Sequence, residues 1–189
     1  MENFKIVKSE FITTDYKKEE KYKHWSRIYE WPYVIDVIKE IKPKSIHNTS
    51  CGGLDEGDCL HITFCKDIDS LCDKAIHSDI WGGTYIGTEI KPEYDNFIYY
   101  DITESFSGKN DMVLNISTLE HLPKDKIINA IDNLLSQLNV NGHMILTFDY
   151  PDIDINIIED YFQCKIKISD NKINHAHLSV VLIHLIKLK

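Results

Sequence analysis

Two segments with the composition of buried strands are each followed by a side chain that can exchange protons. His121 comes after the apolar run 111–117, and Asp149 comes directly after the apolar run 143–148. An imidazole or a carboxylate at such a place can take a proton from a reacting nucleophile, which is general base catalysis. Because an open α/β sheet binds its ligands where the strands end, we predict that His121 and Asp149 are catalytic residues.

A turn with two adjacent glycines, Gly52 and Gly53, follows the predicted strand 44–50. Glycine lets the backbone approach a ligand closely, and amide groups at the end of a strand can hold a polar or anionic group. A nicotinamide site needs the spacing Gly-x-Gly-x-x-Gly, which this turn lacks. An NAD-dependent oxidoreductase is therefore disfavoured, while a ligand-binding loop and an ordinary turn both remain open.

Glu89 lies at the end of residues 84–90, which we predict to be the second strand of the sheet. A carboxylate at this place can accept both hydroxyls of a ribose, a geometry that few other side chains offer. Asp79 takes this role instead if residues 74–80 are the second strand. Either acid can also be an ordinary surface carboxylate.

Asp101 lies near the end of the predicted third strand, residues 96–102. An acid followed by the β-branched Ile102 can receive an adenine amino group and cover the face of the ring. A turn cap is the alternative for Asp101, because aspartate is one of the residues that cap turns and helices.

Soft metal ligands also occur within one short window of the chain. Zinc sites favour cysteine pairs two to four residues apart, whereas the spacings here are wider and follow a helical apolar stripe. We therefore expect structural thiols and no metal site. The residues concerned are Cys59, His61, Cys65 and Cys72.

Helical and strand patterns alternate along the chain, beginning with a helix over residues 21–41. Alternation predicts an α/β fold, with a doubly wound, mostly parallel sheet of about seven strands, helices on both faces and a C-terminal antiparallel hairpin. We expect residues 1–20 to be an N-terminal leader and residues 21–189 to be a single domain, with residues 21–44 as cap helices. Pro32 predicts a separate helix that begins there. The other predicted helices are residues 59–72, 124–138 and 155–162, and the last two predicted strands are residues 164–170 and 177–189.

The composition limits the partners and the compartment. The chain of 189 residues has a formal net charge of −9 and no basic stripe, so no nucleic acid partner is expected. Five cysteines are an odd number, and the first residues lack the apolar region of a signal peptide. No segment approaches the length of a membrane span, so we expect a cytoplasmic protein with reduced thiols and no membrane partner. The oligomeric state is left open.

Several segments, taken in order, resemble the class I S-adenosylmethionine-dependent methyltransferases of the small, single-domain type. "DMVLNISTLEHLPKD" is similar to the fourth strand of that family and its Leu-Glu-His triplet, here Leu119, Glu120 and His121. "TYIGTEIKPEY" and "NFIYYDITESF" are similar to the second and third strands, and "NVNGHMILTF" is similar to the fifth. "SRIYEWPYVIDVI" resembles the helix that some members place before the first strand. The resemblance covers residues 25–188 and implies a Rossmann-like fold.

The resemblance implies an enzyme that binds S-adenosylmethionine and transfers its methyl group. The family's first motif, Asp-apolar-Gly-Cys-Gly-x-Gly, falls on residues 48–54, where Asn48 replaces the aspartate and Ser50 and Leu54 replace two glycines. A catalytically silent binding or regulatory module is the alternative that these replacements raise. The cofactor-binding residues implied by position are Asn48, Ser50, Gly52, Gly53, Glu89, Ile90, Asp101, Ile102 and Ser117.

The resemblance also bears on the methyl acceptor, which we expect to be a small molecule or saccharide-like. The fourth strand leads into "NIST" in place of the Asn-Pro-Pro-aromatic segment of many nucleobase methyltransferases. The N-terminal helices can roof the acceptor pocket, with Arg27, Tyr29 and Trp31 as substrate-binding residues. Packing of the aromatic side chains onto the sheet is the alternative. The family's histidine is often structural, which is the alternative to catalysis by His121.

Overall fold

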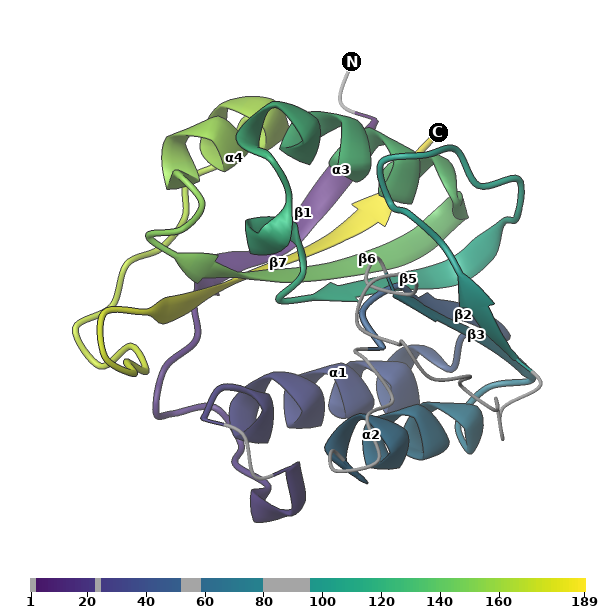
Figure 1. Ribbon diagram of the computed structural model, residues 1–189, viewed down its shortest axis with the longest axis horizontal. Helices are drawn as coiled ribbons and strands as arrows, with labels where there is room; N and C mark the ends of the chain where they lie inside the picture. Colours follow the sequence, from purple (N-terminus) through teal and green to yellow (C-terminus); the bar gives the residue numbers. More distant parts are fainter. Residues whose placement is uncertain (1–2, 23–24, 52–58, 80–95) are drawn as a thin grey trace, which may run out of the picture.

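The computed structural model describes residues 3–22, 25–51, 59–79 and 96–189, with the backbone alone for residues 59–62 and 79 (Figure 1). In this part of the chain, seven strands form one sheet in the order β1-β7-β6-β5-β2-β3-β4. Strands β2 to β6 are parallel, whereas β7 is antiparallel to its neighbours β6 and β1. This mixed sheet confirms the predicted fold class. The strands are β1 (Phe4–Phe11), β2 (Ser45–Asn48), β3 (Lys74–Asp79), β4 (Phe97–Tyr99), β5 (Asn110–Ile116), β6 (Leu138–Tyr150) and β7 (Ser179–Lys187).

Two pairs of helices cover the two faces of the sheet (Figure 1). Helices α1 and α2 lie on one face, and α3 and α4 lie on the other. No helix in the described ranges is long and apolar enough to cross a bilayer. The helices are α1 (Arg27–Ile41), α2 (Cys59–Asp69), α3 (Ile127–Ser136) and α4 (Ile155–Phe162), with short 3-10 helices at Glu20–Tyr22, Leu119–His121 and Lys124–Lys126.

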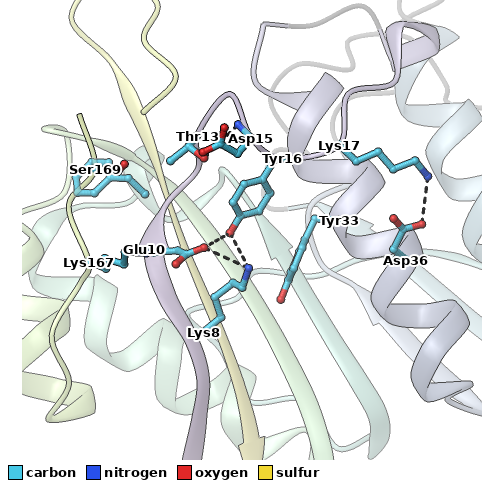
Figure 2. A pocket seen from close by; sticks show the side chains of 11 residues that line it. Lys8, Glu10, Thr13, Asp15, Tyr16, Lys17, Tyr33, Asp36, Lys167 and Ser169 are labelled. Atoms are coloured by element: carbon cyan, nitrogen blue, oxygen red, sulfur yellow. Dashed lines mark hydrogen bonds and ion pairs between the residues drawn. The ribbon is translucent and has the colours of Figure 1, made fainter. Parts of the chain in front are cut away.

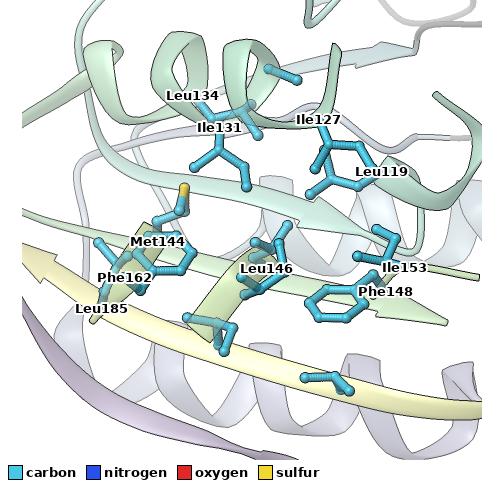
Figure 3. Close-up of a cluster of buried hydrophobic side chains, with 14 of the residues drawn as sticks. Leu119, Ile127, Ile131, Leu134, Met144, Leu146, Phe148, Ile153, Phe162 and Leu185 are labelled. Atoms are coloured by element: carbon cyan, nitrogen blue, oxygen red, sulfur yellow. The ribbon is translucent and has the colours of Figure 1, made fainter. Parts of the chain in front are cut away.

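Strand β6 contributes to the cores on both faces because its side chains alternate in direction. Met144, Leu146 and Phe148 are fully buried against α3 and α4 (Figure 3), while Ile145 packs with α1 on the opposite face. Burying an apolar side chain of this size contributes about 1.5–3 kcal/mol. The same alternation directs Thr147 toward α1, where it meets polar side chains.

Helix α1 continues through Pro32, where we predicted a new helix to begin. A proline inside a helix has no N–H to donate, so the carbonyl four residues earlier loses its partner. That carbonyl belongs to Ile28, and it accepts a hydrogen bond from the backbone N–H of Glu19 at 2.9 Å instead. Because this hydrogen bond satisfies the Ile28 carbonyl from outside the helix, α1 continues as one helix.

The N-terminal segment is a strand, so the prediction of a leader over residues 1–20 is wrong. Strand β1 pairs with β7 along the edge of the sheet, from Phe4 opposite Lys187 to Phe11 opposite Val181. The register shifts between Ile6 and Lys8, which indicates a β-bulge. A bulge moves the following side chains to the other face, and the alternation that marks a strand in the sequence is interrupted.

Two further strand predictions are corrected by the pairing. The second strand of the sheet is β3, because β2 is flanked by β3 on one side and by β5 on the other. Residues 84–90, which we predicted for that place, lie outside the described residues. Residues 164–170 form no named strand and make only an isolated bridge, between Glu10 and Lys167. The place beside β7 that they would need is occupied by β1.

Candidate functional site

A cluster of buried polar side chains joins α1 to the carboxyl ends of β5 and β6. Arg27 Nη1 donates hydrogen bonds to Glu30 Oε1 at 2.6 Å and to Ser117 Oγ at 2.8 Å. Glu30 Oε2 accepts hydrogen bonds from Ser117 Oγ at 3.2 Å and from Thr147 Oγ1. The cluster lies at the edge of the sheet where ligands of α/β proteins bind.

Helix and strand periodicity explain why these side chains meet. Arg27 and Glu30 are three residues apart in α1, so they share one face of the helix. Thr147 lies between two side chains that face α3 and α4, so its own side chain faces α1. Ser117 directly follows β5, and its backbone N–H donates to the Thr147 carbonyl at 2.9 Å.

Glu30 has no exposed side-chain surface (0%) and yet is held in its ionised form. Burial by itself would raise the pKa of Glu30. The charge of Arg27 and hydrogen bonds from Thr147, Ser26 and Arg27 outweigh burial and hold the pKa below its usual value. The result is an ion pair that fixes one guanidinium at the sheet edge.

Glu120 and Asp149 place carboxylate oxygens beside this ion pair. Within the described part of the chain, Glu120 Oε2 and Asp149 Oδ1 are buried and have no hydrogen-bond partner. Burial raises the pKa of Glu120 to about 8, and the charge of Asp149 adds to the effect. Burial, and then the charge of Glu30, raise the pKa of Asp149 to about 6. A buried polar atom without a partner costs about 1–3 kcal/mol, so a ligand that forms hydrogen bonds with these two carboxyl groups would recover that cost.

His121 ends the 3-10 helix next to Glu120, and its side chain is exposed. Partial burial of the ring lowers the pKa of His121, and the charge of Arg27 lowers it further against the opposing effect of Asp152. A neutral imidazole at neutral pH can accept a proton. The structure therefore brings His121, Asp149 and Arg27 to one edge of the sheet, as the sequence predicted.

Ser117 has a backbone conformation that is rare for residues with a side chain. Its φ angle is 43°, in the left-handed region. Strain of this kind costs about 1–3 kcal/mol and is concentrated at binding and catalytic sites. The conformation directs Ser117 Oγ toward both Arg27 and Glu30.

Asn48 and Ser50 lie beneath the turn that follows β2. Asn48 is fully buried, with its Nδ2 3.3 Å from His77 Nδ1 and its Oδ1 accepting from Ser50 Oγ at 3.1 Å. Ser50 Oγ also accepts from the backbone N–H of Ile116 at 2.8 Å. Both side chains are thus engaged inside the protein, where they tie the end of β2 to β3 and β5.

Asp101 and Ile102 follow β4 and differ sharply in exposure. Asp101 is exposed, and its Oδ1 accepts from the backbone N–H of Thr103 at 2.8 Å, so the turn cap considered from the sequence is present. Ile102 is fully buried in the core with α3 (0% exposed). The expectation that Ile102 covers an adenine ring is therefore wrong, because its side chain has no surface to offer.

Four predicted cofactor residues, Gly52, Gly53, Glu89 and Ile90, lie outside the described residues, and their roles stay predictions. Asp79 is the last residue of β3, the strand beside β2. By strand position, the alternative acid occupies the place that we had assigned to Glu89.

The aromatic side chains of α1 pack the helix against its neighbours. Trp31 is 1% exposed and stacks on Phe64 of α2, with ring centroids 4.5 Å apart and ring planes 4° apart. Tyr29 is half-buried and packs against a small apolar cluster that contains Ile12. The prediction that Trp31 binds substrate is wrong because its ring faces α2. Of the three predicted substrate residues, Arg27 lies in the polar cluster.

A separate cavity of about 450 Å³ lies between β1 and α1 (Figure 2). Lys8 forms an ion pair with Glu10 at 3.2 Å and lies over the rings of Tyr16 and Tyr33. The Tyr16 hydroxyl donates to Glu10 at 2.7 Å. These central groups already satisfy one another, so the cavity is a weaker candidate than the polar cluster at the sheet edge.

Sequence reasoning missed Glu30, Thr147 and the role of Glu120. Glu30 follows Arg27 by one helical turn, a spacing that indicates an ion pair. Thr147 is a polar residue inside an otherwise apolar strand, which indicates a buried hydrogen bond. Glu120 was recognised within a Leu-Glu-His triplet but was given no role.

Comparisons with known proteins support the fold. No protein-family model matches the chain, and no curated protein matches it in sequence. Three of the solved structures that match the chain have 13%, 14% and 16% sequence identity to it. The N-methyltransferase NodS from Bradyrhizobium japonicum WM9 has a TM-score of 0.58, over 87% of this chain and 97% of NodS.

TehB from Haemophilus influenzae has a TM-score of 0.60, over 89% of this chain and 67% of the TehB chain. Magnesium protoporphyrin IX methyltransferase (ChlM) from Synechocystis PCC 6803, with bound S-adenosylmethionine, has a TM-score of 0.52, over 83% of this chain and 77% of ChlM. A second NodS structure contains S-adenosyl-L-homocysteine. These likenesses show the fold and confirm the Rossmann-like architecture that the sequence motifs implied.

Proposed function

We propose that this chain is an S-adenosylmethionine-dependent methyltransferase that acts on a small-molecule acceptor. The observation that carries the proposal is the pair of buried, unpartnered oxygens, Glu120 Oε2 and Asp149 Oδ1, beside the fixed charge of Arg27. They lie where the central strands end, the edge at which proteins of this architecture bind ligands. NodS and ChlM, which share the fold, are methyltransferases crystallised with S-adenosyl-L-homocysteine and S-adenosylmethionine.

The described residues fit this cofactor at the same sheet edge. Asp101 presents an exposed carboxylate after β4, where it can accept a hydrogen bond from the adenine amino group. For the ribose hydroxyls we propose Asp79, at the end of β3, with Glu89 as the alternative. Asn48 is already hydrogen-bonded inside the protein, and we assign it to shaping the turn. Ser117 keeps its proposed place beside the cofactor.

S-adenosylmethionine supplies a methyl group that its sulfonium already activates, so the main task of the protein is to orient the acceptor. Arg27, held by Glu30, provides a fixed donor for a polar group of the acceptor. Asp149 has a pKa of about 6, so it is mostly ionised at neutral pH and can take the acceptor's proton at Oδ1. Glu120 has a pKa of about 8, so it is mostly protonated and can donate a hydrogen bond. His121 is the second candidate for the base.

The charges of the site favour a small acceptor over a nucleic acid. Arg27 balances the charge of Glu30, so Asp149, which is mostly ionised at neutral pH, carries the remaining charge of the cluster, and the whole chain has a formal net charge of −9. The Asp149 carboxylate and the net charge both repel a phosphate backbone. A hydroxyl of a saccharide-like molecule can donate to the ionised carboxylate and accept from the protonated one.

A catalytically silent binding module is the second candidate function. It is favoured by the internal hydrogen bonds of Asn48, which leave its amide without a free group for a cofactor. Such a module binds a ligand at the same cluster but transfers no methyl group.

Transfer of label from methyl-labelled S-adenosylmethionine into cell extract, followed by a size filter, tests the proposal. We expect wild-type protein to label molecules that pass the filter, and Asp149→Asn to label them at least about 100-fold more slowly. Asp152→Asn is the control, because Asp152 is a nearby exposed acid. Label retained on nucleic acid or protein contradicts a small-molecule acceptor. Cofactor binding with no labelled product supports the silent module.

A further inference from the structure

Three side chains that commonly bind metal ions meet beneath the turn after β2. They are Cys51, Cys65 and His77, which are all buried and whose ligand atoms all lie within 4.8 Å of one another. They come from three parts of the fold: the segment that follows β2, the middle of α2, and β3. Only Cys65 belongs to the group of cysteines and histidine that the sequence window suggested, because folding brings the other two ligands from distant positions.

The two sulfur atoms are close enough to share one ion. Cys51 Sγ and Cys65 Sγ are 3.2 Å apart, and the backbone N–H of Cys51 donates to the Ser78 carbonyl at 3.0 Å, which holds Cys51 against β3. A bound cation would displace the thiol protons, as metal ions do at cysteine sites.

His77 is oriented in the way that metal-binding histidines usually are. Its Nε2 lies 3.0 Å from Asp69 Oδ1, and that oxygen also accepts from Asn96 Nδ2 at 3.0 Å. A carboxylate that receives the N–H of one ring nitrogen orients the lone pair of the other, as in many metal-binding histidines. That other nitrogen, Nδ1, lies 3.3 Å from Asn48 Nδ2, which is also 3.8 Å from Cys65 Sγ, so a bound ion would replace these hydrogen bonds of Asn48.

We propose that Cys51, Cys65 and His77 form a zinc site, with Asp69 as the residue that orients His77. Two cysteines and one histidine are a common zinc ligand set, and a fourth position is then open to another ligand. A disulfide between Cys51 and Cys65 is the alternative, but it would not explain why His77 and its partner Asp69 lie beside the two sulfur atoms. The ion would link the segment that follows β2 to α2 and β3.

Titration of the full chain with Co²⁺, after removal of bound metal under reducing conditions, tests this site. Co²⁺ replaces Zn²⁺ at such sites, and its bonds to thiolates produce an absorption band in the near ultraviolet. We expect a band that saturates at about one ion per chain and disappears when Zn²⁺ is added. The band should be lost in Cys51→Ser and in Cys65→Ser, and His77→Gln should weaken binding at least about tenfold.

Cys72→Ser and Cys164→Ser are matched controls, because both residues are half-buried cysteines outside the cluster. Both should keep the band, and circular dichroism shows whether each variant folds. Absence of the Co²⁺ absorption band in the wild-type protein is by itself enough to overturn the proposal. So is a band that survives both the Cys51→Ser and the Cys65→Ser substitution. Metal binding is measured directly, so the result does not depend on methyl transfer.

Discussion

The Arg27 guanidinium lies 2.6 Å from the Glu30 carboxylate, one helical turn away, and this ion pair is buried where β5 and β6 end. Ser117 and Thr147 complete the hydrogen bonds of Glu30. The pair therefore belongs both to the packing of α1 on the sheet and to the proposed acceptor site. Removing one partner should affect stability as well as binding.

Glu30→Ala should lower the free energy of unfolding by about 3–5 kcal/mol, because it leaves a buried guanidinium without its partner. Urea denaturation followed by circular dichroism measures the change. Glu40→Ala is the matched control, since Glu40 is an exposed glutamate of the same helix and should change stability by less than about 0.5 kcal/mol. Equal losses of unfolding free energy in Glu30→Ala and Glu40→Ala would contradict the structural role of the ion pair.

Glu120 should make the protein less stable as the pH rises. Burial raises the pKa of Glu120 to about 8, above the value near 4.5 expected in the unfolded chain. Its contribution to stability is therefore complete below about pH 4.5 and is lost as the pH rises through about 8. Glu120→Gln should reduce the loss of unfolding free energy between pH 5 and pH 9 by roughly 4 kcal/mol.

The control for that comparison is Glu104→Gln, which changes an exposed glutamate. The unfolding free energy of Glu104→Gln should depend on pH in the same way as that of the wild-type protein. A Glu120→Gln curve parallel to the wild-type curve would show that Glu120 titrates normally.

Methyl transfer should depend on pH with two limbs. The rate should rise through about pH 6 as Asp149 loses its proton, and fall above about pH 8 as Glu120 loses the proton that it donates. Because the two carboxyl groups interact, the apparent values describe the pair. Formation of S-adenosyl-L-homocysteine at each pH measures the profile. Glu120→Gln should remove the alkaline limb and keep the acidic one, and an unchanged alkaline limb would assign it to another group.

Asp79→Ala should abolish the rise in melting temperature produced by S-adenosyl-L-homocysteine, because Asp79 ends the strand beside β2. A ligand at 100 times its dissociation constant stabilises the folded state by about 2.7 kcal/mol, which is easily measured. Glu89→Ala is the paired variant and should keep the shift. If Glu89→Ala abolishes the shift and Asp79→Ala keeps it, Glu89 binds the ribose hydroxyls, as the sequence first suggested.

The α/β class, helices α3 and α4, and strands β3 and β5 were predictable because their patterns are local. Strand β1 was not, because its bulge interrupts the alternation that identifies a strand. The passage of α1 through Pro32 was not predictable either, since it depends on a hydrogen bond from Glu19, outside the helix. The structure of β1 depends on an irregularity, and that of α1 on a distant contact. Neither can be recognised from a local sequence pattern.

The same contrast holds for the site. The positions of Asp149 and His121 at the sheet edge could be predicted because each follows an apolar run and strand ends meet at one edge, while their catalytic roles stay predictions. The role of Ile102 at the adenine ring was predicted wrongly because exposure changes between neighbouring residues. Asp101 is exposed, whereas the side chain of Ile102 is buried in the core. The cluster of Cys51, Cys65 and His77 was invisible because its members are far apart in the chain.

Calorimetric titration of the full chain with S-adenosyl-L-homocysteine tests the central claim most directly. We predict a saturable heat of binding at about one site per chain, competition by S-adenosylmethionine, and no heat with NADH. Absence of binding at roughly millimolar ligand, with the protein shown to be folded, would contradict the assignment of this sheet edge to a methyltransferase cofactor.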